Sequence, residues 1–590
     1  MEDVYSLDAR LFAEAIKNTD NEYISHEILK FIDFFSHRSI DTSCEGELIT
    51  IQHAANLIFH ALANPDYFIP ERLIPKFVTS ATLFSNLAYL TEFGTTDSFL
   101  SMIANQRHNL PKILTLYTPR NTTDIPLEKL FKASPVMTTL WWAMLTNQFR
   151  GITKESSQKY HKLLTSKEAW DGYDITNNNY EKFDWLTHPA FDISYTAPDM
   201  EKPLRQLTNE QLKAIRIYRT KPPSRNYKNV LVISYAFRKG MAIHKAIAEY
   251  FHALKPEYRL TYLNLQHAAD PFVMDDDLFD EIIHAFDETG LSEKAFKALQ
   301  EGDYGVIIYP DTSLCFNSSA LAQSRLAPIQ ITTYGHPVST WSDEMDYFIG
   351  GQDTEADFTY GNYSERLVLL PGNGNCPLPV TDIADEPELD EYRICCSWGY
   401  IKTHYAMLDL LNRIRERSDK PIKFFFTDIN TNRLTFLAAK KEIESVMGDG
   451  AIVSRSLPRP LYMKNIAQCK FAIDSWPFGG FNRILDLLAQ KRPVIIREGN
   501  RAYNRMNAAL LERIGLEELV VQTEKQVISK SLELIFNEDY RLSLIERIGK
   551  ADIYNKGDAK YFKKALDFLI TNHDALHIFK NNKPIIIKRD

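Results

Sequence analysis

The sequence changes its pattern at residues 221–228, a polar segment with two adjacent prolines that is typical of a linker. Beyond this segment, short apolar runs alternate with helical stretches of about ten residues. The first examples are an apolar run at residues 229–234 and a helical stretch at residues 241–254. Because this alternation is typical of βαβ units, the chain from residue 225 onward is predicted to form parallel sheets covered by helices.

The alternation continues with strand-like runs at residues 260–263 and 305–309, with a helix predicted between them near residues 276–286. It pauses at residues 371–391, which are rich in glycine, proline and acidic residues, and then restarts. Two successive doubly wound units bind a ligand at the carboxyl ends of their strands, which suits a nucleotide-sugar transferase. The predicted fold class is therefore α/β of the GT-B type, with two Rossmann-like domains. The later predicted strands are residues 392–397, 422–426, 451–453, 471–474 and 493–496.

Residues 7–219 are predicted to be mostly helical, because apolar side chains recur there at three-and-four spacing and strand signals are few. The region shows no fixed repeat period, so we expect an all-α N-terminal domain rather than a repeat array. Its tryptophans are predicted to be mainly core residues, with lining of an acceptor groove as the alternative: Trp141, Trp142, Trp170 and Trp185.

The charge balance, the N-terminal residues, the lengths of the apolar runs and the cysteine spacing each disfavour a class of protein. The chain has 68 Lys and Arg against 77 Asp and Glu and lacks a basic block, so nucleic acid is not the expected partner. Residues 1–20 lack the features of a signal peptide, and no apolar run reaches the roughly 18 residues of a membrane span, so we expect a cytoplasmic protein. The six cysteines have no CxxC spacing and are predicted to be buried, reduced thiols: Cys44, Cys315, Cys376, Cys395, Cys396 and Cys469.

Two loops between a predicted strand and a predicted helix carry residues suited to a nucleotide. Lys402 can neutralise a diphosphate as a compact charge, unless it is a solvated loop lysine. Gly479 and Gly480 let phosphate oxygens approach the backbone near the positive end of a helix that begins around Asn482. Asp486, one turn inside that helix, can accept the ribose hydroxyls. The alternative is a helix cap followed by an acid that stabilises the helix dipole.

A third strand end places His336 between Gly335 and Pro337. A histidine directly after a strand is expected to face a cleft, although a structural histidine in a turn remains equally open at this point.

These segments resemble glycosyltransferase family 41, and most closely its bacterial branch of cytoplasmic protein N-glycosyltransferases that modify high-molecular-weight adhesins. O-GlcNAc transferases are more distant relatives. The best match runs from residues 325–330 through residues 335–343. The Pro477-Phe-Gly motif with Asn482 and Asp486 is similar to the family's nucleotide loop, and Lys402 falls where the family's diphosphate-binding lysine lies. The resemblance extends at lower identity from about residue 230 to 570. The helical N-terminal region matches only in size and helical character.

The resemblance implies an inverting, metal-independent transfer of a hexose, expected to be glucose, from a UDP-sugar to asparagine in an Asn-X-Ser/Thr sequon of a protein such as an adhesin. It implies no cofactor beyond the UDP-sugar donor. Lys402 and the helix N-terminus at Phe481 and Asn482 would stabilise the departing UDP. Asp486 would hold the ribose, and Arg325 and His336 would lie toward the sugar or the acceptor. The implied domains are residues 1–220 (all-α, acceptor or partner side), 225–380 (Rossmann-like, acceptor side) and 390–590 (Rossmann-like, nucleotide sugar).

The sequence departs from the family at two histidine positions. Gly240 stands where the family has a histidine near the acceptor, which leaves Arg238 and His244 as the candidate catalytic residues in that loop. Ser456 or Arg455 stands where the family has a histidine beside the nucleotide base.

Other functions remain as alternatives or are disfavoured. A transferase that acts on a glycan, or a catalytically weakened accessory or chaperone subunit that binds a nucleotide sugar or an adhesin, remains open. Residues 275–277, three aspartates, resemble a metal-binding DxD motif but are predicted to precede a helix that begins near Leu278, where acids stabilise the N-terminus. Residues 371–376 lack GxGxxG spacing, so a dinucleotide oxidoreductase is disfavoured. The asparagines at 177–179 are predicted to form a turn.

Overall fold

The computed structural model describes residues 7–37, 45–176, 186–267, 273–274, 277–287, 290–427, 429, 433–554, 557–578 and 583–590. The chain forms two compact units. Unit 1 consists of Met1–Tyr180, Trp398–Glu416 and Ile422–Pro458, and unit 2 consists of Glu181–Ser397, Arg417–Pro421 and Arg459–Asp590. The domain limits inferred from the sequence stay predictions.

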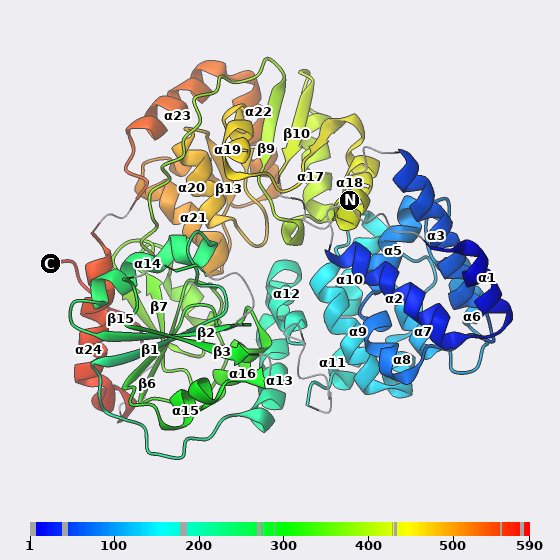
Figure 1. Ribbon diagram of the computed structural model, residues 1–590. Coiled ribbons are helices and arrows are strands. Elements are labelled where there is room, and N and C mark those ends of the chain that lie inside the picture. The colour runs from blue at the N-terminus through cyan, green and yellow to red at the C-terminus, as the bar shows by residue number, and fades with distance from the viewer. Residues whose placement is uncertain are drawn as a thin grey trace. The chain divides into compact units, whose positions relative to one another are not determined.

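The N-terminal part of unit 1 is helical, and its described residues contain no strand, as predicted (Figure 1). The apolar spacing of the second helix explains this, because Ile28, Phe31, Ile32 and Phe35 share one buried face. The helices are α1 (Ala9–Lys17), α2 (Asn21–His37), α3 (Glu45–Ala63), α4 (Ile74–Val78), α5 (Ala81–Leu90), α6 (Asp97–Ile103), α7 (Leu110–Leu116), α8 (Leu127–Ala133), α9 (Pro135–Gln148), α10 (Lys154–Thr165) and α11 (Lys167–Gly172).

The later segments of unit 1 add two parallel strands and their helices. Phe424 pairs with Ala451 in this ladder, and α18 packs against α5 of the helical region. The elements are η5 (Tyr400–Lys402), α17 (Tyr405–Arg415), β10 (Ile422–Phe426), α18 (Arg433–Met447), η6 (Gly448–Gly450) and β11 (Ala451–Val453).

A buried ion pair joins the helical region to α18 inside unit 1. Arg120 donates from Nε and Nη2 to the two carboxylate oxygens of Glu442, each at 3.0 Å. Its Nη1 donates to Ser85 Oγ at 2.8 Å and to Asn86 Oδ1 at 3.0 Å, so all three guanidinium nitrogens have partners. The Glu442 side chain is fully buried. Burial lowers the pKa of Arg120, but Glu442 outweighs this effect and raises it above its ordinary value. The Arg120 guanidinium is therefore charged, and both carboxylate oxygens of Glu442 accept hydrogen bonds from it.

Unit 2 begins with short helices and then forms a mainly parallel sheet, called the first sheet below, in the order β15-β8-β7-β6-β5-β1-β2-β3-β4 (Figure 1). Among the described strands of this sheet, only the β3–β4 pair is antiparallel. The elements are α12 (His188–Thr196), α13 (Glu201–Leu212), β1 (Asn229–Ser234), α14 (Ala242–Leu254), β2 (Arg259–His267), β3 (Glu281–Asp287), β4 (Gly290–Leu291), α15 (Glu293–Glu301), β5 (Val306–Tyr309), α16 (Phe316–Leu321), β6 (Ile329–Thr333), β7 (Tyr347–Gly351), β8 (Arg366–Leu370), α24 (Ala559–Ile578) and β15 (Ile585–Ile586).

Both faces of this sheet are buried, as the continuous apolar runs predict. Along β1, Val230 and Val232 enter one core cluster, which α14 and α24 cover. Leu231 and Ile233 enter the opposite cluster, which α15 and α16 help to cover. Alternate side chains thus pack on opposite faces, so polar and catalytic groups are left to the strand ends.

The helix predicted near residues 276–286 is wrong, because Glu281–Asp287 is strand β3. Its apolar residues fit a helical period, but the buried Ile283 and Ala285 alternate with less buried neighbours, and residues 281–284 pair in register with β2. Leu278 lies in a turn rather than at a helix start, and Asp275 and Asp276 lie outside the described residues.

The remaining strands continue the predicted pattern. In unit 2, β9, β12, β13 and β14 pair in parallel in that order. The acidic segment before β9 has no regular structure but is ion-paired, since Glu388 contacts Arg541, Lys470 and Arg492. The elements are β9 (Tyr392–Cys396), α19 (Arg459–Ala467), β12 (Phe471–Ile473), α20 (Phe481–Ala489), β13 (Val494–Arg497), α21 (Ala502–Arg513), β14 (Val520–Val521), α22 (Glu524–Phe536) and α23 (Glu538–Lys550).

The cysteine prediction is confirmed for burial where the structure describes the residues, and Cys44 lies outside them. The five described cysteines are buried and form no disulfide with one another: Cys315, Cys376, Cys395, Cys396 and Cys469. Trp141 and Trp142 are core residues as predicted, and Trp170 is half-buried. Trp185 and residues 177–179 lie outside the described part. Among the described helices, none has the length and apolar character needed to cross a membrane.

We predict that Glu442→Ala lowers the free energy of unfolding by about 3–5 kcal/mol, because it leaves the Arg120 charge buried without its partner. Urea denaturation followed by tryptophan fluorescence measures the effect. Glu444→Ala is the control, since it removes only the exposed pair with Lys440 on the same helix and should cost less than about 1 kcal/mol. Equal losses for the two variants would contradict the prediction.

Candidate active site

A close backbone approach brings the ends of β5 and β6 against the start of α14. A Cβ atom on Gly335 would lie 2.1 Å from the Pro310 carbonyl oxygen and 2.9 Å from Ile243. Only glycine fits this position, which is why the residue before His336 carries no side chain. His336 therefore follows β6 directly at the carboxyl edge of the sheet, as predicted.

His336 is 5% exposed and lies among aromatic rings. The centroid of its ring is 5.2 Å from that of Phe191 and 6.1 Å from that of Phe478. Among the described residues, neither ring nitrogen has a hydrogen-bond partner. Burial, with a smaller contribution from the charge of Arg205, holds the pKa of His336 well below its ordinary value. The imidazole is therefore neutral near pH 7, with one nitrogen able to donate and one able to accept.

Arg205 was missed by the sequence analysis. It lies on α13, is buried, donates from Nη2 to Ser194 Oγ at 3.2 Å and is 3.8 Å from Glu201. It also lines a small polar cavity of about 20 Å³ beside Phe191, enough for one water molecule. Because Arg205 lies on a helix in a region without a recognised motif, the sequence gave no sign that it would lie close to His336.

The Pro477-Phe-Gly motif meets His336 through Phe478. The Phe478 ring stacks on Tyr195 with centroids 4.1 Å apart and on Tyr503 at 4.3 Å. Two motifs that are distant in the sequence are thereby brought to one place.

Asp474, which the sequence analysis did not single out, closes the glycine loop. Its Oδ1 accepts the Gly480 N–H at 3.1 Å, and its Oδ2 accepts from Asn507 at 2.6 Å. Gly479 has no room for a side chain, since a Cβ atom would lie 2.7 Å from the Tyr503 carbonyl oxygen. Among the described residues, no side chain caps the N-terminus of α20, where Phe481 begins the helix. The helix therefore presents its first N–H groups as an anion-binding end.

Asn482 joins this loop to the start of α14 by donating from Nδ2 to the Ala242 carbonyl oxygen at 3.1 Å. Gly240, two residues earlier in that loop, has a φ of +81°, and the space around it is open. A histidine would fit there sterically, but its backbone would be strained. Arg238 donates to Gln266 at 3.1 Å, and His244 is buried on α14 against Phe237.

Asp486 is paired with an arginine that the sequence analysis overlooked. Arg459 donates from Nη1 and Nη2 to the two Asp486 oxygens, each at 2.6 Å, and from Nε to Asp382 at 2.6 Å. Burial lowers the pKa of Arg459, but the two carboxylates outweigh this and raise it above its ordinary value. Each Asp486 oxygen keeps a further lone pair, so its ribose-binding role stays a prediction.

Lys402 and Ser456 belong to unit 1. Lys402 closes the short turn η5, with its N–H bonded to the Gly399 carbonyl oxygen at 2.9 Å. Tyr400 anchors this turn, because its buried hydroxyl is hydrogen-bonded to the Arg150 backbone, and burial raises its pKa to about 12. Ser456 is half-buried in the segment after β11. The roles predicted for both residues remain predictions.

Arg325 and His336 lie at opposite ends of β6, and the place predicted for Arg325 toward the sugar or the acceptor stays a prediction. Arg325 precedes β6, whereas His336 follows it, so the strand separates them by about 17 Å at its ordinary rise per residue. Its guanidinium pairs with Glu344 at 3.0 Å and Asp346 at 2.7 Å. A residue in a segment that closely resembles the family can therefore form ion pairs within the fold.

Asp311 holds the loop that contains Arg238 and Gly240. This fully buried carboxylate accepts the N–H groups of Tyr235 at 3.0 Å and Ala236 at 2.5 Å. Burial raises its pKa to about 6, and the backbone bonds only partly oppose that effect.

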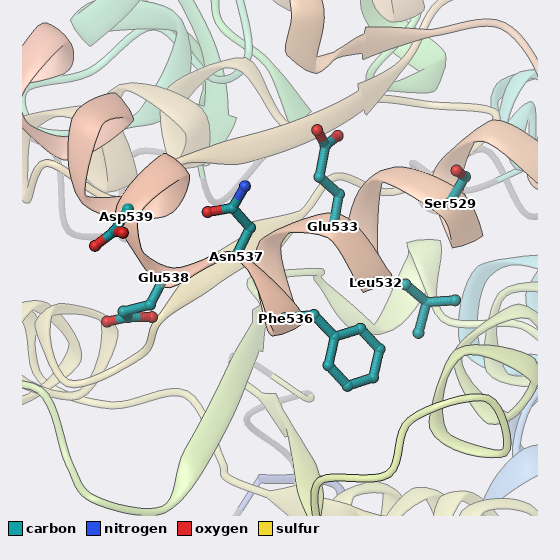
Figure 2. A pocket seen from close by; sticks show the side chains of 7 residues that line it. All are labelled: Ser529, Leu532, Glu533, Phe536, Asn537, Glu538 and Asp539. Carbon is teal, nitrogen blue, oxygen red and sulfur yellow. The ribbon is translucent and has the colours of Figure 1, made fainter.

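Figure 2 shows a different hollow, on the surface between the end of α22 and the start of α23. Carboxylates of Glu533, Glu538 and Asp539 line it, together with Phe536 and Leu532. Three acidic groups would repel a diphosphate, so this hollow is not a candidate donor site.

Comparison with known proteins finds glycosyltransferases among the proteins similar to this chain. No family model matches the chain. The UDP-glucose:protein N-beta-glucosyltransferase of Actinobacillus pleuropneumoniae serotype 5b (strain L20) is 23% identical over 468 residues, which cover 75% of this chain and 73% of that protein. The resemblance to glycosyltransferase family 41 is confirmed. A more distant relative is the probable UDP-N-acetylglucosamine–peptide N-acetylglucosaminyltransferase SPINDLY of Hordeum vulgare, 22% identical over 47% of this chain and 30% of that protein.

Among solved structures, a mutant O-GlcNAc transferase from Thermobaculum terrenum superposes with a TM-score of 0.61. The match covers 97% of this chain and 99% of that one at 15% identity, so it establishes the fold. The predicted GT-B class, with parallel α/β sheets and a helical N-terminal region, is confirmed.

We predict that Asp311→Asn removes a pH dependence of stability. Since the pKa of about 6 in the folded protein exceeds the ordinary value of 3.8, the folded carboxyl keeps its proton where the unfolded one has lost it. The contribution of Asp311 to stability is therefore highest in acid and falls as the pH rises through 4 to 6. Relative to the wild type, the variant should gain about 2 kcal/mol between pH 4 and pH 8, measured by urea denaturation. A constant difference between the two proteins would contradict this.

Proposed function

We propose that the protein is an inverting glycosyltransferase that moves a hexose, glucose in the first instance, from a UDP-sugar to asparagine in an Asn-X-Ser/Thr sequon of a protein. The observation that carries the proposal is the meeting of His336, Phe478 and the uncapped N-terminus of α20 at the carboxyl edge of the first sheet. The names of the sequence relatives support the donor and the protein acceptor.

The donor diphosphate is proposed to bind at the α20 N-terminus, where the N–H groups of Phe481 and Asn482 meet its oxygens. Lys402 supplies a second positive group, and Asp486 accepts the ribose hydroxyls. As the bond to the sugar breaks, charge grows on the departing UDP, and these fixed groups stabilise it without reorganisation. No metal ion is required at the reacting centre in this scheme, because amides and lysine provide the positive charge.

His336 is proposed to orient the hexose or the acceptor amide through hydrogen bonds. Its pKa lies well below the ordinary value because of burial and Arg205, so it acts as a neutral partner rather than as a cation. Inversion follows from a single displacement, in which the asparagine nitrogen attacks the anomeric carbon from the face opposite UDP. The bond from that carbon to the UDP oxygen breaks, UDP leaves with the electron pair, and the amide nitrogen loses one proton to solvent.

We further propose an adhesin-type acceptor and a cytoplasmic location. A second candidate is a catalytically weakened accessory subunit, which Gly240 favours because it replaces the histidine of the family with a residue that has no side chain. Transfer to a glycan is the remaining alternative.

The test combines the wild type, Lys402→Ala and Lys440→Ala with a panel of UDP-hexoses and an Asn-X-Thr peptide, without added metal. We expect the wild type to release UDP and add one hexose mass to the peptide. Loss of Lys402 should lower kcat by about 100-fold or more, since it removes a group that stabilises transition-state charge. Lys440→Ala is the matched control, because Lys440 is an exposed lysine of the same unit.

Three results would count against the proposal in different ways. Donor binding with no transfer to the peptide or to an adhesin fragment favours the accessory role. Transfer only to a glycan would show that the acceptor is a glycan and not a protein. Absence of UDP-sugar binding by the wild type overturns the nucleotide site itself.

A further inference from the structure

The C-terminal helix α24 carries two histidines one turn apart, His573 and His577. Residues four apart on a helix share a face. The helix packs on the first sheet of unit 2, and Figure 1 shows it in red beside the green strands. His573 is buried on this side, whereas His577 is exposed.

Asp346 completes a group with these histidines. It immediately precedes β7, and one ligand atom from each of Asp346, His573 and His577 lies within 4.8 Å of the others. The two imidazole centroids are 5.5 Å apart. Ligand atoms around a tetrahedral zinc ion are about 3.3 Å apart, so a small rotation of the exposed His577 side chain would close the group around an ion.

Neighbouring groups already orient two of the three side chains. Asp346 accepts bonds from Arg325 at 2.7 Å and from the Gln330 N–H at 2.8 Å, and both go to Oδ2. His573 Nδ1 is 3.0 Å from the Tyr347 hydroxyl, which leaves Nε2 to face another partner. Ligands in metal sites are commonly held in this way, with a hydrogen bond to the atom that does not bind the ion.

The local charge also suits a cation. Arg325 is shared between Asp346 and Glu344, to which it donates at 3.0 Å. These three side chains sum to one negative charge, so Arg325 does not fully neutralise the acids beside the histidines. Two imidazoles and one carboxylate are a ligand set typical of zinc and its neighbours, and not of magnesium or calcium.

We propose that Asp346, His573 and His577 bind a divalent transition-metal ion of the zinc type, which ties α24 to the first sheet. The group lies apart from His336, because β6 and β7 are parallel: Asp346 lies before β7 at the amino edge, and His336 lies after β6 at the carboxyl edge. The inference therefore does not depend on the proposed transferase function, and an ion bound here is compatible with a sugar transfer that uses no metal ion at the candidate active site.

The test titrates the chelator-treated, full-length protein with Zn²⁺ and Co²⁺ by calorimetry, follows the visible absorption of bound Co²⁺, and records thermal unfolding. We expect one ion per chain and a higher midpoint of unfolding, since an ion that binds only the folded protein stabilises it. Mg²⁺ should give neither signal.

His577→Ala is the decisive variant, because the side chain is exposed and its loss leaves the packing of α24 intact. It should weaken Zn²⁺ binding at least tenfold and remove the shift in the midpoint. His252→Ala, an exposed histidine on α14, is the control and should bind as the wild type does. Failure of the wild type to bind saturably, or equal affinity of the wild type and His577→Ala, overturns the site.

Discussion

The tight contact at Gly335 is the constraint on which the candidate site depends. Because the Pro310 carbonyl leaves no space for a side chain there, the end of β6 can press against the end of β5 and the first turn of α14. His336 is then fixed by covalent geometry at the edge of a sheet whose two faces are full of apolar side chains. The same approach brings the start of α14 within reach of Asn482, so one missing Cβ positions both the histidine and the loop of Arg238 and Gly240.

Unit 1 shows a corresponding arrangement around Lys402. The turn that holds this lysine is anchored by Tyr400 on the Arg150 backbone, and the charges of Glu442 and Arg120 reach the same hydroxyl. The helical region therefore helps to hold this turn, because Arg120 and Arg150 of that region lie close to the Tyr400 hydroxyl. A buried ion pair such as Arg120–Glu442 adds little net stability when both partners are present. Its hydrogen bonds are satisfied in only one side-chain geometry, and this favours a rigid turn beside it.

The sequence predicted the parts of the fold that depend on local pattern. The continuous apolar runs of β1 and β5 are buried strands as predicted, and the glycine loop before α20 is followed by a helix as expected. It failed at β3, where Ile282, Ile283 and Ala285 fit either period and the neighbouring strand decides. It could not find Arg205, Arg459 or Asp474, because their places depend on contacts between segments far apart in the chain. The segment of Arg325 resembles the family, and in the structure its side chain pairs with two acids at the amino end of β6, which the sequence did not indicate.

The charge of the candidate donor region shows why composition alone is a poor guide to it. The whole chain is acidic by nine charges, yet Arg459 lies against Asp486, and Lys245 lies close enough that its pKa is lowered by burial and by Arg459. Asp486 and Asp382 balance these cations. A dianionic ligand that competes for Arg459 would release the Asp486 oxygens from it, so recognition of the phosphates and of the ribose would be coupled through a single guanidinium. Such coupling needs no basic patch, only a cation already held between two carboxylates beside a helix N-terminus.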